Sequence, residues 1–384
     1  MHAARWDVFG KVVDNYGDAG VCWRLARQLV AEHEIAVTLW IDELAPLARI
    51  APGVDAAATV QAVAGVELRR WREPFAETPR PGDVVIEAFG CGLPDAYVAA
   101  MTRCAHPPRW FVLEYLSAED WVEGTHGLAS PHPRLPLDRR FWFPGFTAAT
   151  GGLLRERGLI AARDAFRRDD AARRALWARM GVPPPERDET RVSLFCYPNA
   201  PVAALCDAWA DGDAAVTCLV PAGVAAGALD RWAGGRLPHP GEAMVRGRLT
   251  VRAIPFVAQD EYDRLLWACD VNFVRGEDSF VRAQWAGRPF VWHIYPQDEA
   301  AHRLKLDAFL ARYLTGLDDT AAAGVRRFWR AWNADPDAGE IAAAWVAFAQ
   351  ARPELANHGE RWTGTLAALP DLAGGLVKAS RKRL

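Results

Sequence analysis

Short apolar runs alternate with longer stretches of helical periodicity, and this alternation limits the folds open to the chain more than any other feature. The runs Val84–Ile86 and Trp110–Leu113 follow Gly-Asp and Pro-Pro breakers, as expected for strands buried in a parallel sheet. Apolar residues recur at helical spacing from Val21 to His33, and Pro94–Cys104 has a helical composition. Strands that alternate with helices predict an α/β layer fold.

The alternation starts again after a proline-rich segment. Residues Leu153–Met180 form a polar, Arg-rich stretch that is predicted to be helical, and three consecutive prolines, Pro183–Pro185, follow it beside charged residues. This composition is typical of a linker. Beyond it, strand-like and helical runs alternate a second time from Val192 to Trp292, and from about Asp298 the chain is predicted to be helical.

The length of 384 residues suits two domains, at roughly 100–200 residues each. We predict a first domain at residues 1–184, joined by a returning C-terminal helix at about 361–384, and a second domain at residues 185–360. In open parallel sheets ligands bind beyond the carboxyl ends of the strands. Two such domains predict a two-substrate enzyme or a binding protein that closes on its ligand.

Composition excludes several classes of protein. The net charge is −3 and no long basic block occurs, apart from the short tail Arg381–Arg383, which argues against nucleic-acid binding. The seven cysteines include no C-x-x-C pair, so free thiols in a reducing cytosol are expected. Neither a signal-peptide core nor an uncharged apolar run of about 18 residues is present, so we expect a cytoplasmic protein without a membrane span.

The first candidate site is the glycine-containing stretch Asp14–Gly20, which follows the strand-like run Trp6–Val12 and precedes a helix. Glycine allows the backbone to approach a ligand closely, and a helix N-terminus presents free N–H groups. Two carboxylates, Asp14 and Asp18, stand four residues apart and are predicted to point into a cleft. The alternative is that Asp18 caps the helix, because aspartate is a favoured N-cap residue.

The second candidate site is the strand–turn–helix stretch Val274–Arg282. A diphosphate is predicted to lie on the N–H groups of the helix that starts near Asp278, with the hydroxyl of Ser279 and the charge of Arg275 beside it. The carboxylates of Glu277 and Asp278 repel phosphate, so sugar or ribose hydroxyls are their expected partners. The alternative is a capped helix with a surface salt-bridge pair.

Weaker signals lie at the ends of other strands. The aromatic residues of Phe195–Tyr197 and Phe256–Gln259 can stack on a base, although core packing is the commoner role. Leu113–Leu116 ends a strand of the first domain and can help to shape an acceptor side. No phosphate-binding P-loop, G-x-S-x-G or H-E-x-x-H pattern occurs, and a metal site at His293 and His302 is disfavoured.

Several of these strings resemble the EarP family of protein-arginine rhamnosyltransferases, which modify bacterial elongation factor P. The resemblance is carried by four segments: Asp14–Arg27, Leu113–Glu119, Arg275–Ser279 and Trp292–Gln297. It implies a GT-B fold, with two Rossmann-like domains facing a central cleft and a C-terminal helix that crosses back. It also implies dTDP-β-L-rhamnose as donor, an arginine of elongation factor P as acceptor, inversion at the anomeric carbon, and no metal or other cofactor.

The resemblance also assigns roles to individual residues. Asp18 matches the carboxylate proposed as general base, and Asp14 matches the one that helps to hold the acceptor guanidinium. Glu114 and Tyr115 are predicted on the acceptor side. The predicted donor-binding residues, which include the thymine pocket and the diphosphate and sugar contacts, are Phe195, Tyr197, Phe256, Gln259, Arg275, Glu277, Asp278, Ser279 and Gly17.

The predicted chemistry is consistent with these residues. A guanidinium stays protonated at neutral pH, because its pKa lies above about 12. Two carboxylates can bind its fork in a bidentate way, and one of them can take the proton as the nitrogen attacks. A helix N-terminus and Arg275 can neutralise the departing diphosphate in place of a metal.

Three alternatives remain open at the level of the sequence. One is a GT-B transferase for another acceptor, or an epimerase, that uses another nucleotide sugar. The second is a non-enzymatic sugar-nucleotide sensor, which has no use for a base such as Asp18. The third is a nucleic-acid-binding translation factor, which needs a basic face that the composition does not provide.

Overall fold

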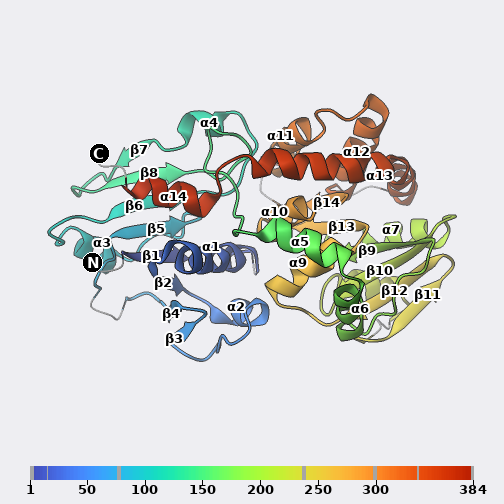
Figure 1. Cartoon of the computed structure of the whole chain (residues 1–384), viewed down its shortest axis with the longest axis horizontal. Helices are drawn as coiled ribbons and strands as arrows, with labels where there is room; N and C mark the ends of the chain where they lie inside the picture. The colour runs from blue at the N-terminus through green and yellow to red at the C-terminus, as the bar shows by residue number, and fades with distance from the viewer. Residues whose placement is uncertain are drawn as a thin grey trace. The chain divides into compact units, whose positions relative to one another are not determined.

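The computed structural model describes residues 4–14, 16–75, 79–235, 239–296, 301–334 and 337–381. The chain forms two compact α/β units (Figure 1). The first unit comprises Met1–Arg157 together with Leu366–Leu384, and the second comprises Gly158–Thr365. Gln297 and the tail residues Lys382 and Arg383, which the sequence analysis singled out, lie outside the described residues.

The first unit is built around a mixed sheet. In the described part of the chain its eight strands lie in the order β3-β4-β2-β1-β5-β6-β8-β7. The pairs β3–β4 and β7–β8 are antiparallel and form the two edges, and all the pairs between them are parallel. The strands are β1 Arg5–Gly10, β2 Ala36–Ile41, β3 Val60–Val63, β4 Val66–Arg70, β5 Val84–Ala88, β6 Arg109–Leu113, β7 Ala129–Pro131 and β8 Asp138–Trp142.

The parallel strands of this sheet follow the doubly wound order. From β4 to β8 they are the third, second, first, fourth, fifth and sixth along the chain, so the direction of winding reverses between β1 and β5. Ligands of such sheets bind at this reversal, outside the carboxyl ends of the strands. The helices of this unit are α1 Gly17–His33, α2 Leu44–Ile50, α3 Asp95–Met101, α4 Trp121–Thr125 and α14 Leu372–Arg381.

The second unit repeats this plan with a smaller sheet. Its six described strands lie in the order β11-β12-β10-β9-β13-β14, only the β11–β12 pair among them is antiparallel, and the winding reverses between β9 and β13. The strands are β9 Glu189–Leu194, β10 Ala215–Pro221, β11 Ala243–Arg246, β12 Leu249–Ile254, β13 Val271–Arg275 and β14 Phe290–His293. Its helices are α5 Leu159–Arg168, α6 Asp170–Arg179, α7 Val202–Ala210, α8 Ala226–Trp232, α9 Gln259–Ala268, α10 Asp278–Ala286, α11 Ala301–Tyr313, α12 Asp319–Trp332 and α13 Ala338–Ala367.

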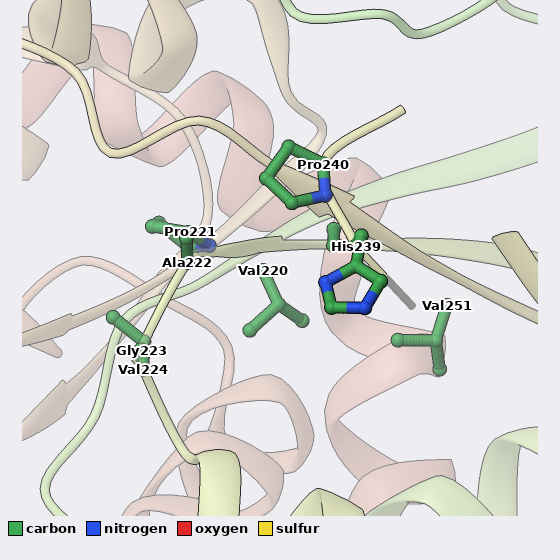
Figure 2. A pocket seen from close by; sticks show the side chains of 9 residues that line it. Val220, Pro221, Ala222, Gly223, Val224, His239, Pro240 and Val251 are labelled. Atoms are coloured by element: carbon green, nitrogen blue, oxygen red, sulfur yellow. The ribbon is translucent and has the colours of Figure 1, made fainter. Parts of the chain in front are cut away.

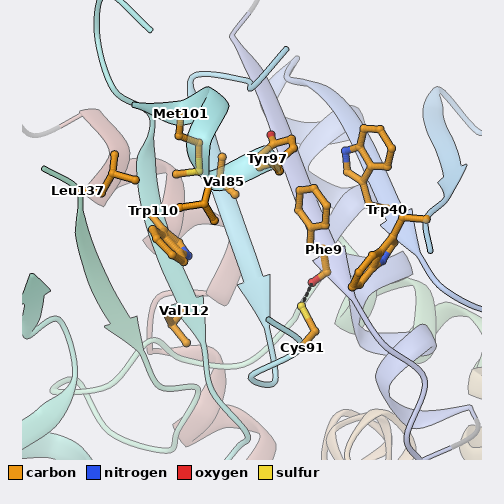
Figure 3. Packing of buried hydrophobic residues seen from close by; sticks show 11 residues of the cluster. Phe9, Trp40, Val85, Cys91, Tyr97, Met101, Trp110, Val112 and Leu137 are labelled. Carbon is orange, nitrogen blue, oxygen red and sulfur yellow. Dashed lines mark hydrogen bonds between the residues drawn. The ribbon is translucent and has the colours of Figure 1, made fainter. Parts of the chain in front are cut away.

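Aromatic side chains fill one core of the first unit. Phe9 on β1 stacks on Trp40 of β2 at 5.5 Å and meets the ring of Tyr97 from α3 edge-on at 4.6 Å (Figure 3). The carboxylate of Asp7 is buried beside them and accepts hydrogen bonds from the Tyr97 hydroxyl at 2.5 Å, the Gly82 N–H at 2.6 Å and the Trp40 indole at 3.1 Å. A carboxyl group this deep needs hydrogen-bond partners, so these bonds fix α3 and β2 against β1.

The C-terminal segment, Leu366–Leu384, belongs to the first unit. Helix α14 packs on α1, and the buried amide of Gln28 donates to Asp371 just before α14 at 3.1 Å. Arg155 donates to the carbonyl oxygens of Ala367, at 2.6 Å, and Leu369, at 3.3 Å, where the long helix α13 ends. A guanidinium satisfies the unpaired carbonyls of a helix C-terminus and opposes its dipole.

The predicted boundary at residues 184 and 185 differs from the structure, which changes unit between Arg157 and Gly158. The segment Leu153–Met180 is not one helix: α5 starts at Leu159, and Asp169 breaks the run and caps α6 by accepting from the Ala172 N–H. Both helices belong to the second unit because they pack on α9, and α5 also packs on α10. The buried side chain of Arg163 on α5 fixes this packing, because it donates a hydrogen bond to the carbonyl of Trp285 on α10 at 2.9 Å.

All seven cysteines are free thiols, and six of them are buried, with Cys104 partly exposed. No helix among the described residues combines the length and the apolar composition that a membrane span requires.

Candidate active-site residues in each unit

Asp18 lies at the winding reversal of the first unit, in the first turn of α1. Its carboxylate accepts hydrogen bonds from the backbone N–H groups of Val13, at 2.9 Å, and Asp14, at 2.8 Å. These donors belong to the loop before the helix, and the residue at the N-cap position is Tyr16. Asp18 therefore holds the β1–α1 loop, and the alternative that it caps the helix is wrong.

Asp14 is held close to the start of the same helix. Its carbonyl oxygen accepts from the Gly17 N–H at 2.7 Å. A Cβ atom on Gly17 would lie 2.8 Å from a carboxylate oxygen of Asp14, so any other residue here would displace that side chain. Gly17 thus lets the Asp14 carboxylate lie against the helix N-terminus. The structure brings Asp14, Gly17 and Asp18 together, whereas Asn15 lies outside the described residues.

Burial controls the electrostatics of Asp18. The side chain is 4% exposed, and burial is the main influence that raises the pKa of its carboxyl above the ordinary value. Hydrogen bonds from Asp14, Val13 and the Tyr115 side chain lower that pKa, and the nearby charge of Asp42 raises it. The result is a carboxylate that holds a proton more strongly than a solvated aspartate, which is the property of a useful base.

Tyr115 joins this group from a distant part of the sequence. It follows β6, its side chain hydrogen-bonds Asp18, and its ring stacks on Phe89 with the centroids 4.6 Å apart. Glu114 beside it is half-buried, and its backbone N–H donates to the Trp142 carbonyl at 3.0 Å. The structure therefore places Tyr115, which was predicted on the acceptor side, next to Asp18. No sequence pattern marks Phe89 or Asp42.

In the second unit, Arg275 lies between two aromatic rings. It ends β13, next to the winding reversal, and its guanidinium carbon lies 4.5 Å from the ring centre of Phe195 and 4.7 Å from that of Tyr197. It also donates to the Cys196 carbonyl at 3.2 Å. Three of the predicted donor-binding residues thus contact one another at the carboxyl ends of β9 and β13. A cation over two rings is stabilised by their electron-rich faces.

The turn between β13 and α10 is built on Gly276 and Ser279. The Ser279 hydroxyl accepts from the Arg275 N–H at 3.0 Å and donates to the Arg275 carbonyl at 2.5 Å. Gly276 has a φ of 60°, a left-handed conformation that favours glycine. This arrangement starts α10 at Asp278, directly after the strand, and presents its N-terminus at the sheet edge.

The other predicted donor residues lie on adjacent elements. Gln259, the buried first residue of α9, donates to the Asp278 carboxylate at 3.0 Å, which joins the N-termini of α9 and α10. Glu277 is at the N-cap position of α10 and makes no capping bond through its side chain. Phe256 is half-buried in the segment between β12 and α9. Of the two aromatics near Arg275, Phe195 also packs on Tyr262, with ring centroids 5.7 Å apart.

His293 supports the aromatic pair. Its Nδ1 accepts from the Tyr197 N–H at 3.2 Å, and its ring lies 5.2 Å from that of Tyr197. Burial, with smaller effects from Arg275 and His302, lowers the pKa of His293 to about 3, so it is neutral at physiological pH. Among the described residues no group of three or more His, Cys, Asp or Glu side chains is arranged to hold a metal ion.

A small cavity opens at the end of β10 in the second unit. Its volume is about 150 Å³, below the typical ~300–1,000 Å³ of ligand sites. Figure 2 shows its mainly aliphatic lining with one imidazole at the side; the residues are Val220, Pro221, Ala222, Gly223, Val224, His239, Pro240, Val251 and Ala253. No predicted donor residue is among them, so the cavity is separate from the Arg275 cluster.

Comparison with known proteins places this arrangement in one family. Residues 6–381 match the family model described as elongation factor P (EF-P) rhamnosyltransferase EarP. A protein-arginine rhamnosyltransferase of Pseudomonas putida is 53% identical over 99% of this chain and 100% of its own length, and one of Pseudomonas aeruginosa is 46% identical over 98% of each.

Solved structures agree with this placement. A structure described as the basis for EarP-mediated arginine glycosylation of translation elongation factor EF-P matches with a TM-score of 0.69 at 41% identity, over 99% of this chain and 100% of that one. A glycosyltransferase of Rickettsia africae matches with a TM-score of 0.53 at 8% identity, over 99% of this chain and 97% of that one, and supports the fold alone.

Proposed function

This chain belongs to the EarP family of elongation factor P rhamnosyltransferases, and from that premise we propose the details of its reaction. It is a glycosyltransferase of the GT-B class. We propose that it transfers L-rhamnose from dTDP-β-L-rhamnose to one arginine side chain of elongation factor P, inverting the anomeric centre without a metal ion.

The observation that carries this proposal is the buried carboxylate of Asp18, held by two loop N–H groups and by Tyr115 at the winding reversal of the first sheet. In the proposed reaction Asp14 and Asp18 bind the acceptor guanidinium, which localises its charge. One guanidinium nitrogen attacks the anomeric carbon while the carbon–oxygen bond to the nucleoside diphosphate breaks. Asp18 takes the proton that this nitrogen loses, and the diphosphate leaves with the bonding electron pair.

The donor half of the proposal rests on the Arg275 cluster. Phe195, Tyr197, Phe256 and Gln259 are proposed to hold thymine and deoxyribose. The N–H groups at the start of α10, with the Ser279 hydroxyl and the Arg275 charge, are proposed to bind the diphosphate. Such fixed positive groups stabilise the leaving group as its charge develops, which supports a reaction without a metal.

Glu277 and Asp278 are proposed to bind sugar hydroxyls. Both residues are half-buried at the N-terminus of α10, and the Asp278 carboxylate is fixed by Gln259. Carboxylates repel phosphate and form charge-assisted bonds to hydroxyl groups. Gly17, in the first unit, is proposed to allow close approach of the sugar to the loop that carries Asp14 and Asp18, because it has no side chain.

The acceptor and the thiols together suggest where the protein works. A translation factor is a cytoplasmic partner, and seven free cysteines suit a reducing compartment. We therefore propose a cytoplasmic location and elongation factor P as a transient protein partner.

Intact-mass spectrometry of purified elongation factor P, incubated with this protein and dTDP-L-rhamnose, tests donor, acceptor and reaction together. A gain of one deoxyhexose that maps to one arginine is the expected result. Release of nucleoside diphosphate without a mass gain would indicate another acceptor, or an epimerase or hydrolase that uses this donor. Binding of the donor with neither release nor mass gain would support a sensor and contradict the proposal.

A further inference from the structure

Phe89 is connected to the candidate active site of the first unit, although no sequence motif marks it. We propose that Phe89 is a positioning residue for the transfer: its ring holds Tyr115 where the phenol bonds the carboxylate of Asp18. This inference rests on the proposed function, which makes Asp18 the base.

The backbone at Phe89 indicates that this side chain is needed where it is. Its φ is 56°, in the left-handed region that side chains rarely adopt, and the next residue, Gly90, has a φ of 61°. Glycine would occupy the Phe89 position with less strain. Strained positions of this kind cluster at active sites, where the surrounding structure enforces them.

Pairing of the parallel strands fixes the position of the Phe89 ring. Ala88 at the end of β5 pairs with Leu113 at the end of β6, and the Phe89 N–H donates to the Leu113 carbonyl at 2.7 Å. The loop after β5 and the loop after β6 therefore begin side by side. Phe89 and Tyr115 stack with their ring planes 17° apart and their centroids separated by 4.6 Å.

The same sheet order brings this ring pair to Asp18. Strand β1, which leads into the Asp18 loop, is the neighbour of β5 on the side opposite β6. Three adjacent central strands, β1, β5 and β6, thus lead into Asp18, Phe89 and Tyr115 at the carboxyl end of the sheet. The hydrogen bond from Tyr115 to Asp18 joins the segments that follow β6 and β1, across the end of β5. The stacked Phe89 ring restricts the orientation of the phenol that makes this bond.

The charges around Asp18 make that orientation important. Asp42, after β2, is a nearby negative charge, and Asp14 belongs to the same loop. The N–H groups of Val13 and Asp14 and the phenol of Tyr115 oppose these negative charges by donating hydrogen bonds to the Asp18 carboxylate. Loss of the phenol leaves the carboxylate with less support for its charge, so its proton affinity rises and its orientation becomes less defined.

The experiment compares Phe89→Asn, which tolerates a left-handed backbone but lacks the ring, with Phe89→Tyr, which keeps the ring. Tyr115→Phe removes the phenol hydroxyl directly, and Phe141→Leu removes a ring from β8 in the same sheet as a control for lost stability. Two quantities are measured: the acid limb of the pH profile of kcat/KM, and the titration of Asp18 by ¹³C NMR in the free protein.

We expect Phe89→Asn and Tyr115→Phe to move the acid limb and the Asp18 titration to higher pH together, with kcat lowered roughly 10–100-fold, the scale of a catalytic group displaced by about 1 Å. The double variant should show no more than the larger single effect, and Phe89→Tyr should recover most of the loss. An unchanged Asp18 titration in Phe89→Asn, or the same shift in Phe141→Leu, would overturn the proposal. The NMR titration needs no acceptor, so it remains decisive even if the proposed transfer is not observed.

Discussion

At the scale of single residues, the chemistry depends on how Asp18 is held. A solvated aspartate is a weak base, and burial strengthens it by raising the pKa, whereas the hydrogen bonds from Val13, Asp14 and Tyr115 keep that rise limited. The side chain is therefore both a base and a fixed part of the loop. A carboxylate held in this way accepts a proton during transfer more readily than a solvated aspartate would.

Asp18→Asn should lower kcat/KM by about 10²–10⁴-fold, the usual contribution of a general base, and leave donor affinity unchanged. In the wild type the pKa of Asp18 lies above 3.8, so activity should be lost as the pH falls through that raised value. Rhamnosylation rates between about pH 4 and pH 8 measure both effects. Asp42→Asn is the control: it removes a charge that raises the Asp18 pKa, so its acid limb should move to lower pH. Wild-type turnover in Asp18→Asn would remove Asp18 from the role of base.

Arg275→Ala should weaken binding of dTDP about 10–100-fold, because a desolvated charge-assisted contact is worth about 1.5–3 kcal/mol. Arg275→Lys should recover only part of this, since lysine lacks the planar fork. Isothermal titration with dTDP measures the change. Arg246→Ala is a matched control, because Arg246 also lies over an aromatic ring, that of Trp232, but is exposed on β11. Equal affinities in Arg275→Ala and Arg246→Ala would exclude Arg275 from the anion site.

At the scale of elements, the predicted donor-binding residues depend on helices α9 and α10, whose N-termini lie side by side. The Arg282 guanidinium on α10 donates to both oxygens of Asp263 on α9, at 2.9 and 2.6 Å, and both side chains are buried. Gln259 and Asp278 join the N-termini of the same two helices. The two contacts fix the register of α9 against α10 and hence the place of Ser279 and Asp278.

Asp263→Ala should lower the free energy of unfolding by about 3–5 kcal/mol, because it removes the carboxylate that pairs with the buried charge of Arg282. Replacing both residues with apolar ones should recover much of that loss. Urea unfolding measures each variant. The pair Arg330–Asp307 is exposed on both sides, so Asp307→Ala should cost less than about 1 kcal/mol. A loss in Asp263→Ala as small as in Asp307→Ala would show that the buried pair is not needed for stability.

At the scale of the whole molecule, the chain leaves the first unit at Arg157 and returns to it after Thr365. The return is secured within the first unit, where Arg155 donates to the carbonyls of Ala367 and Leu369 and α14 buries Leu372, Ala373, Leu376 and Val377. Because α14 packs on α1, whose first turn contains Asp18, a terminal segment helps to fix the helix that carries the base.

Leu376→Ala should therefore destabilise the first unit by about 2–5 kcal/mol, the usual cost of truncating a buried leucine. Thermal unfolding should show the loss of stability. Hydrogen exchange should locate it as reduced protection in α1 and α14, with protection of the second unit unchanged. Lys378→Ala, an exposed change on the same helix, is the control. Equal loss of protection in both units would contradict a local role for α14.

The sequence alone predicted the central strands of each sheet and the two loops that carry the candidate site residues, Asp14–Gly20 and Arg275–Ser279. Runs such as Val84–Ile86 and Trp110–Leu113 are recognisable because a strand buried on both faces is mainly apolar. The strands β3, β4, β7, β8 and β11 escaped notice because they are short and partly exposed, and so carry no such pattern. Asp14, Asp18 and the Arg275 loop were marked by carboxylates, glycine and arginine directly after strands.

The tertiary structure alone decided which of these residues meet. Tyr115 reaches Asp18 only because β6 and β1 lie on either side of β5, and strand order is a long-range property that no local pattern carries. The left-handed backbone at Phe89 is set by contacts with the next loop rather than by its own residue type. Likewise α5 and α6 belong to the second unit because their side chains find partners on α9 and α10, which the proline run at Pro183–Pro185 does not indicate. Local composition specifies elements, whereas the packing between them specifies the site.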